Sequence, residues 1–377
     1  MTKSRDIANS TSTLDVDGGT IKLDGNYPVG TENVALGNTA LDDASVGNYN
    51  VAIGDASLTA NTGSNNTAVG ASSMDANTSG GDNVAMGAAT LRANTTGSYN
   101  TALGRHALTS NTTASSNTAV GYQAGYSNTT GQPITATGYY TLNQNTTGVH
   151  NNAYGYRAMR LNTTGGYNTA LGGDALYSNT TASYNTAVGY QAMYLSNASG
   201  NGFNTSVGYA SGYNLSTGVS NSLFGYNCGS QLTTGSKNTI LGSFNGNQGN
   251  LDIRTSSNHI VLSDGDGSPR VYVDGNGDTH FGEWKNNWTT YNGMVAVVAN
   301  ASDPYPFSVK AMSTTQGFMG FYNSSNTLVG NIFKNSNSTA YNTSSDYRLK
   351  ENVDYTWDAT TRLKQLKPAR FNFIADA

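Results

Sequence analysis

The sequence is poor in the residues that hold ordinary compact domains together. Its 377 residues include one cysteine and six prolines, and only 11% are Asp, Glu, Lys or Arg. The lone cysteine, Cys228, excludes an intrachain disulfide framework. With 36% hydrophobic residues, a single conventional core is not expected over this length.

Long apolar segments are also missing. No stretch approaches the roughly 20 apolar residues of a membrane-spanning helix, and no secretory signal follows the first positive charges. The formal net charge is −4, without a basic run of the kind that binds nucleic acid or an anionic membrane. The histidines share no metal-ligand spacing, so no metal and no other cofactor is predicted. They are His106, His150, His259 and His280.

Glycine is abundant instead, and it recurs at an almost fixed interval. A marker glycine returns thirteen times, mostly 17 residues apart, and usually closes the phrase Asn-Thr-Ala-Val-Gly or a close variant. A period this short and regular predicts a solenoid of about thirteen 17-residue coils. The marker glycines are Gly37, Gly54, Gly70, Gly87, Gly104, Gly121, Gly138, Gly155, Gly172, Gly189, Gly208, Gly225 and Gly242.

Within each phrase, large and small side chains alternate. In an extended strand, Thr101 and Leu103 point to one face and Ala102 points to the other. We expect the bulky face to form an apolar column inside the chain, and the flat Ala/Gly face to meet neighbouring chains. A second apolar pair, such as Ala107-Leu108, predicts a return strand that closes each coil.

Asn-Thr-Thr segments lie between the strands, again 17 residues apart. Asn tolerates left-handed backbone angles, and its amide can bond along a stack of coils, so these segments are predicted to form a ladder of turns. They also match the N-glycosylation acceptor pattern, which is the weaker interpretation. The asparagines are Asn94, Asn111, Asn128, Asn145, Asn162 and Asn179.

Tyrosine follows the marker glycine in several coils. Because tyrosine offers an apolar ring and a hydroxyl, a row of such side chains is a candidate carbohydrate-binding surface. The alternative is a ladder that only stiffens the solenoid. The tyrosines are Tyr122, Tyr139, Tyr156, Tyr190, Tyr209 and Tyr226.

The repeated phrase, the alternation of small and large residues and the coil length resemble the head repeats of trimeric autotransporter adhesins of the YadA type. The resemblance covers about residues 31–250. It implies an all-β fold, a left-handed parallel β-roll that assembles as a homotrimer. Residues 1–30 are then interpreted as an N-terminal attachment segment.

After about residue 250 the period ends, and short strands separated by glycine turns follow. Residues 251–345 are therefore predicted to form a β-rich stem or neck. Two segments, 264–268 and 274–278, superficially resemble calcium loops, with oxygen donors at alternate positions. Both lack the glycine and glutamate that such loops need further along, so hairpin turns are the better interpretation.

One motif near the C-terminus carries chemistry. Thr343-Ser-Ser-Asp-Tyr-Arg-Leu-Lys-Glu-Asn-Val353 is followed by Leu363-Lys-Gln-Leu-Lys-Pro-Ala-Arg-Phe-Asn-Phe373. These segments closely resemble the start of the self-cleaving intramolecular chaperone domain of phage endosialidases, tailspikes and tail fibres. The resemblance implies that Ser345 is the nucleophile, that Lys350 is the base, and that the chain is cut between Ser345 and Asp346. The alternative is a solvated patch of charges.

These features predict a phage tail fibre or spike, located in the virion, with residues 346–377 forming a short, truncated α/β chaperone fragment. The expected partners are two further copies of the chain, a host-surface glycan or other receptor, and a tail or baseplate protein, but neither nucleic acid nor the membrane interior. The only expected enzymatic step is a single-turnover self-cleavage. A bacterial trimeric adhesin and a polysaccharide depolymerase are the alternatives, although a depolymerase usually needs a pair of carboxylates in a cleft.

Overall fold

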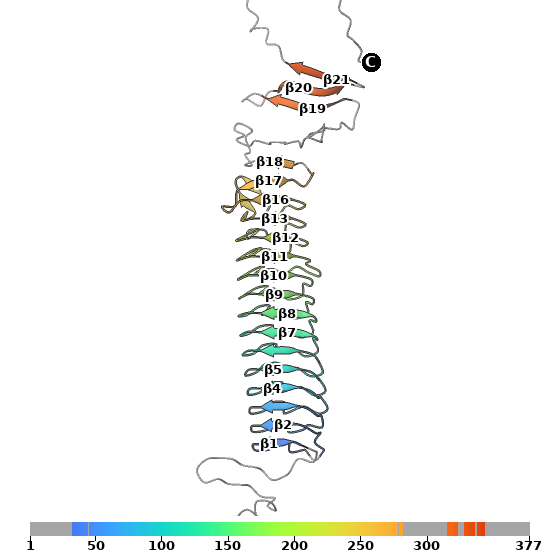
Figure 1. Cartoon of the computed structure of the whole chain (residues 1–377), viewed down its shortest axis with the longest axis vertical. Coiled ribbons are helices and arrows are strands. Elements are labelled where there is room, and N and C mark those ends of the chain that lie inside the picture. Colours follow the sequence, from blue (N-terminus) through green and yellow to red (C-terminus); the bar gives the residue numbers. More distant parts are fainter. Residues whose placement is uncertain are drawn as a thin grey trace, which may run out of the picture. The chain divides into compact units, whose positions relative to one another are not determined.

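The computed structural model describes residues 32–43, 45–277, 279–281, 315–322, 328–335 and 338–343, and these form strands and turns without any helix. The chain divides into two units, a solenoid that ends with β18 and a separate sheet of three strands. The solenoid is a stack of coils with one short strand each (Figure 1). A fold of stacked coils of about 17 residues, predicted from the glycine period, is confirmed.

The solenoid strands follow the repeated phrases. They are β1 (Val34–Leu36), β2 (Val51–Ile53), β3 (Thr67–Val69), β4 (Val84–Met86), β5 (Thr101–Leu103), β6 (Thr118–Val120), β7 (Ile134–Thr137), β8 (Asn151–Tyr154), β9 (Thr169–Leu171), β10 (Thr186–Val188), β11 (Thr205–Val207), β12 (Ser222–Phe224) and β13 (Thr239–Leu241). Five further strands follow in this unit: β14 (Asn247–Gln248), β15 (Leu251–Asp252), β16 (Ile260–Ser263), β17 (Pro269–Val273) and β18 (Thr279–Phe281).

Each strand pairs in parallel with the strand one coil away, so that equivalent residues of the phrase lie side by side. Ala85 is aligned with Ala102, and Ala102 with Ala119. The sheet continues past residue 250, because β16 pairs in parallel with β13 after the small hairpin β14–β15. The strands β17 and β18 then add in antiparallel fashion and end the sheet.

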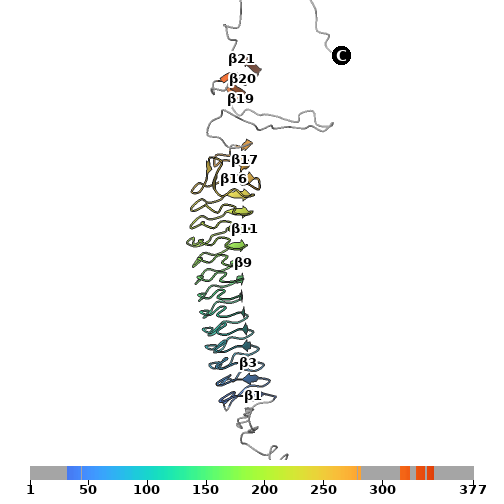
Figure 2. The same ribbon diagram turned by 90° about the vertical axis from the view of Figure 1, so that its left-hand side faces the viewer.

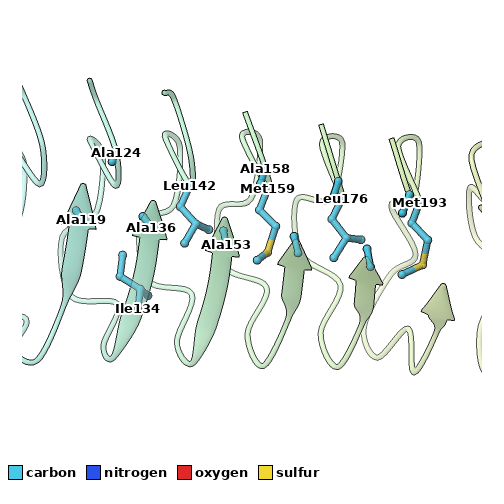
Figure 3. Close-up of a cluster of buried hydrophobic side chains, with 14 of the residues drawn as sticks. Ala119, Ala124, Ile134, Ala136, Leu142, Ala153, Ala158, Met159, Leu176 and Met193 are labelled. Atoms are coloured by element: carbon cyan, nitrogen blue, oxygen red, sulfur yellow. The ribbon is translucent and has the colours of Figure 1, made fainter. Parts of the chain in front are cut away.

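The two faces of the strands are the reverse of what the alternation of side chains led us to expect. Ala102 is fully buried, whereas Leu103 is 45% exposed. The alanines face a row of Leu and Met from the opposite side of each coil, as Leu142 and Met159 show in Figure 3. In most coils that row already fills the narrow interior, so alanine fits on the strand and the bulky residues point outward. In the last coils, where glycine interrupts the row, the strand carries a large buried side chain such as Leu223 instead.

The predicted return strand is also wrong. The segment after each marker glycine is a run of turns, in which His106 and Leu108 have φ values of 62° and 50°. This left-handed backbone reverses the chain within a few residues, while coil-to-coil bonds persist, such as Leu108 N–H to Ala124 C=O at 3.0 Å. Figure 2 shows the strands along one side of the stack and the turns along the other.

The marker glycines are needed for close packing of the coils. Gly104 has a φ of 121°, and a Cβ added there would lie 2.7 Å from the carbonyl oxygen of Gly121. That distance is far below a normal contact, and an L-residue rarely adopts this φ. The spacing between adjacent coils therefore fixes glycine at this position.

The turn asparagines form the predicted ladder. The Asn111 side-chain amide donates to Asn94 Oδ1 at 2.8 Å and to the Ala114 carbonyl at 2.9 Å, and Asn128 donates to Asn111 Oδ1 at 3.0 Å. These asparagines are fully buried. Both amide protons of Asn111 are used, so this side chain is not free to carry a glycan in the folded chain.

A second asparagine ladder runs at the start of the strands. The Asn100 backbone N–H donates to Asn83 Oδ1 at 2.9 Å, and the Asn100 amide donates to the Ala114 carbonyl at 3.0 Å. These bonds satisfy backbone groups that would otherwise be buried without partners. Together the two ladders give the narrow interior a polar half beside the apolar column.

Large and small residues exchange between interior positions in the coil of Gly125. Gly125, like Gly212 and Gly229, stands where most coils have Leu or Met, and Ile134 stands where the neighbouring coils have Asn. A Cβ on Gly125 would lie 2.9 Å from Leu108 Cδ2 and 3.5 Å from Ile134 Cδ1. Ile134 thus occupies the volume that Gly125 leaves, and the interior remains filled.

The two acidic segments beside β17 are hairpin turns, as predicted. The Gly267 N–H donates to the Asp264 carbonyl at 3.1 Å, and the Gly277 N–H to the Asp274 carbonyl at 3.0 Å. The Asp264 carboxylate binds the Arg270 guanidinium. In the separate unit, β19 (Thr315–Tyr322), β20 (Leu328–Asn335) and β21 (Ser338–Thr343) form an antiparallel sheet in that order.

Candidate functional surfaces

The outward face of the solenoid strands carries no charge and exposes a large apolar side chain in most coils. We call the outward side chains of β1–β13 and β16 the strand face; all of them are uncharged. Leu171 is 46% exposed and Leu241 is 55% exposed. The other exposed large apolar members are Val34, Ile53, Val84, Met86, Leu103, Tyr154, Phe224, Ile260 and Leu262. Threonine accompanies the apolar side chain in many coils, and β7 has threonine at both outward positions, so the apolar row is interrupted there. Exposed apolar side chains repeated over this length are typical of a surface that binds another protein.

The six tyrosines after the marker glycines lie in two stacks. Tyr122, Tyr139 and Tyr156 have ring centroids 5.4 and 5.5 Å apart. The second stack contains Tyr190, Tyr209 and Tyr226, with centroids 5.7 and 5.5 Å apart. Gly173 separates the two stacks. Because the rings stack on one another along the solenoid, they present mainly edges and hydroxyls to solvent.

Two further aromatic ladders were not singled out from the sequence. One contains Tyr177, Tyr194 and Tyr213, at centroid distances of 5.0 and 5.1 Å. The other runs through His150, Tyr167, Tyr184 and Phe203, at 4.7, 5.0 and 5.3 Å. Both follow the coil period, so the same 17-residue spacing could have revealed them at other positions of the repeat.

An ion pair lies where the tyrosine stacks are interrupted. Arg157 Nε and Nη2 donate to the two Asp174 carboxylate oxygens at 2.8 and 2.9 Å. The Arg157 guanidinium also lies over the rings of Tyr156 and Tyr177, 4.6 and 5.1 Å from their centroids. The hydrogen bonds that Arg157 donates to Asp174 raise the pKa of the Arg157 guanidinium. Asp174 is buried, so the pair fixes two neighbouring coils together.

A second arginine extends this group along the solenoid. Arg160 Nη1 donates to the Tyr177 hydroxyl at 3.1 Å, and its guanidinium lies 5.0 Å from the Tyr140 ring centroid. Tyr140 in turn packs edge-on against Tyr122 and Tyr139. The first tyrosine stack and the Tyr177 ladder thus belong to one surface, with arginines between them.

The residues of the predicted self-cleavage reaction, Ser345, Asp346 and Lys350, lie outside the described residues. The described residues contain no group of three His, Cys, Asp or Glu side chains placed to hold a metal ion. Cys228 is buried, and burial raises the pKa of its thiol to about 12. The thiol is therefore protonated at neutral pH and is a poor nucleophile.

No protein-family model, no curated protein and no solved structure matches this chain. Within the part of the chain that the structure describes, no helix is long and apolar enough to cross a membrane. The functional proposal below therefore depends on the surfaces of the solenoid and on the sequence motifs alone.

Proposed function

We propose that this protein is a homotrimeric fibre of a phage tail that presents glycan-binding surfaces to the host. In this proposal the solenoid is a left-handed β-roll, and a β-stem and a C-terminal chaperone fragment follow it. The described strands support the shaft, because fourteen parallel strands at a spacing of about 4.8 Å span about 60 Å. The tail fibre would attach to a tail or baseplate protein through residues 1–30.

The observation that carries the proposal is the uncharged strand face. Its exposed Leu, Ile, Val and Met side chains are costly to leave in water over so many coils, and each contributes about 25 cal/mol per Å² when buried. Each coil offers a strip only two side chains wide. Such a narrow strip favours a closed arrangement of copies around a shared axis, as in the trimeric relatives that the repeats resemble.

Three copies would also multiply weak binding. Each coil repeats nearly the same outward positions, and a trimer presents them three times around the shaft. Shallow sites of low affinity can then act together, because the second contact is made at a high effective concentration. This arrangement suits attachment to a repetitive surface polymer.

The C-terminal motif completes the proposal. Ser345 Oγ would form an ester with the carbonyl carbon of the peptide bond that precedes Asp346, Lys350 would take the hydroxyl proton and pass it to the departing Asp346 amine, and water would then hydrolyse the ester. A lysine with its ordinary pKa of about 10.4 is a poor base at neutral pH, so Lys350 must be desolvated. Burial in an assembled trimer would provide this and would link release of the chaperone to correct assembly. A parallel trimer folds slowly and exposes strand edges, which gives the chaperone its purpose.

Two masses of the purified full chain test this function. We expect the native mass to equal that of three chains. The mass of the denatured chain should correspond to a chain that ends at Ser345, and the Ser345→Ala variant should give the mass of the uncleaved chain. An uncleaved wild-type trimer would contradict the processing step alone. A monomer would contradict the fibre itself.

A further inference from the structure

The arginines of the central coils gather on one face of the solenoid. Residues 83–236 contain four arginines, no lysine or glutamate, and a single aspartate, Asp174. The arginines are Arg92, Arg105, Arg157 and Arg160. They occupy the turn segments that follow the strands, where the tyrosine stacks also lie. The sequence alone hides this grouping, because the residues are far apart in the chain and the net charge is negative.

A continuous set of contacts joins Arg157 and Arg160 to His106, and Arg105 occupies the repeat position that Tyr122 occupies one coil later. The His106 ring packs edge-on against Tyr122 and Tyr126, with centroids 6.3 and 6.1 Å apart. Tyr122 packs against Tyr140, which lies under Arg160. Arg160 and Arg157 share Tyr177. We call this set the arginine–tyrosine surface; it contains Arg105, His106, Tyr122, Tyr126, Tyr140, Tyr156, Arg157, Arg160, Asp174 and Tyr177.

Not all of this positive charge is neutralised. Asp174 neutralises Arg157, but neither Arg105 nor Arg160 forms an ion pair among the described residues. Arg160 Nε is buried without a hydrogen-bond partner in that part of the chain. The pKa of His106 is lowered first by burial and then by the positive charges of Arg105 and Arg92. The electrostatic potential near His106 is therefore positive.

We infer that the arginine–tyrosine surface binds an anionic polysaccharide, whose sugars carry carboxylate or sulfate groups. Guanidinium groups bind such oxyanions with paired hydrogen bonds. The row of tyrosine hydroxyls can exchange hydrogen bonds with sugar hydroxyls. The inference rests on the proposed fibre function and names the class of its receptor.

The stacking geometry favours a polysaccharide over nucleic acid. Single-stranded nucleic acid binds through bases that stack on free aromatic faces. Here the rings of Tyr122, Tyr139 and Tyr156 cover one another, and the Arg157 guanidinium covers Tyr156 as well. Charged groups and hydroxyl edges remain available, and these match an acidic sugar chain.

Binding of defined polymers to the full-length chain tests the inference. The probes are heparin, polygalacturonate, neutral dextran and single-stranded DNA, each at low and at high salt. We expect binding to heparin, to polygalacturonate or to both, weakened by salt, and none to dextran. Polygalacturonate carries carboxylates alone, whereas heparin carries sulfates as well as carboxylates. Binding to heparin but not to polygalacturonate would therefore identify sulfate as the anion that is recognised.

Arginine variants locate the site. Arg105→Gln and Arg160→Gln should each weaken binding about tenfold, the value of one charge-assisted hydrogen bond. Arg105→Lys keeps the charge and should retain most of the binding. The matched control is Lys237→Gln, which removes an exposed positive charge elsewhere on the solenoid and should change binding less than about twofold. Thermal unfolding of each variant shows whether it is folded.

Several results would overturn the inference. They are failure to bind either anionic polysaccharide at low salt, equal loss of binding in Lys237→Gln, and equally tight binding of DNA through the same arginines. Dextran or host-cell binding without arginine dependence would reject the anionic receptor and leave the fibre proposal standing. A monomeric wild-type chain that binds heparin through Arg160 would reject the fibre and support the inference.

Discussion

The first coils of the solenoid differ from the central coils on the outside but not on the inside. Residues 32–82 contain six acidic residues and neither lysine nor arginine, whereas residues 83–236 contain four arginines and one aspartate. Where the central coils have Tyr139 and Tyr156 after the marker glycine, the first coils have Asn38 and Asp55. Both regions share buried strand alanines, buried turn leucines or methionines, and the asparagine ladders.

Interior residues therefore define the coil, whereas the outward residues differ from one region of the solenoid to the next. The interior stays filled, because a small residue at one position is matched by a larger one nearby, as Ile134 matches Gly125. The outward positions change from acidic to basic and aromatic without any change in backbone register. Variants that act on the inside should therefore affect the two regions alike, and variants on the outside should affect them differently.

The largest effect is expected from the asparagine ladder. Asn77→Ala in the first coils and Asn111→Ala in the central coils each remove a fully buried amide that bonds to the coil before and to its own turn. Because buried partners are left unsatisfied, each variant should lower the free energy of unfolding by about 2–4 kcal/mol. The measurement is urea unfolding, with the exposed Asn38→Ala as the control. A loss of stability in only one of the two asparagine variants would contradict the conclusion that the two regions have similar interiors.

The ion pairs should separate the two regions. Asp174→Ala leaves Arg157 without its partner in a largely buried site and should lower the free energy of unfolding by about 2–3 kcal/mol. Asp75→Ala, near the boundary, breaks an exposed pair with Arg92 and should cost less than about 0.5 kcal/mol. Thermal unfolding of both variants makes the comparison, and equal shifts would contradict it.

A gain of stability is expected where the asparagine ladder ends. Asn179 Oδ1 and Ser196 Oγ are both buried without a hydrogen-bond partner among the described residues. Ser196→Asn places an amide donor one coil after Asn179, as in the coils before it, and should raise the free energy of unfolding by about 1 kcal/mol. Ser196→Ala is the control and should be close to neutral. A loss of stability in Ser196→Asn would show that this longer coil has no room for the ladder.

The smallest effect concerns pH. Burial, followed by two nearby arginines, lowers the pKa of His106, so the unfolded chain takes up the proton first. The contribution of His106 is fully present above the usual histidine pKa of about 6.5 and is lost as the pH falls below that value. The first coils contain no histidine. Protection of the central coils against hydrogen exchange, after correction for the intrinsic exchange rate at each pH, should therefore decrease between about pH 7 and pH 5, and His106→Gln should reduce that change.

The coil length, the turn ladder and the stacking of tyrosines could be predicted from the sequence, because each depends on the 17-residue period, which is visible in the order of the residues. It could not tell which strand face is inside. Ala102 and Leu103 alternate either way, and the choice depends on Leu108, which fills the interior from the opposite side. The arginine–tyrosine surface was missed for a similar reason. Arg105 and Arg160 lie at different positions of the repeat, and the path of the turns, which the sequence does not show, brings both onto the side of the solenoid that carries the tyrosines.

The native mass of a strand-face variant shows whether the strand face joins the copies of the proposed trimer. Leu103→Asp would place three carboxylates at the shared axis of the proposed trimer, where charge is costly to bury. The control, Thr96→Asp, adds the same charge on an exposed turn. We predict that the native mass of the wild type and of Thr96→Asp equals that of three chains, and that the native mass of Leu103→Asp equals that of one chain. A wild-type monomer, or a Leu103→Asp protein that keeps the mass of three chains, would contradict the claim that the strand face joins the copies.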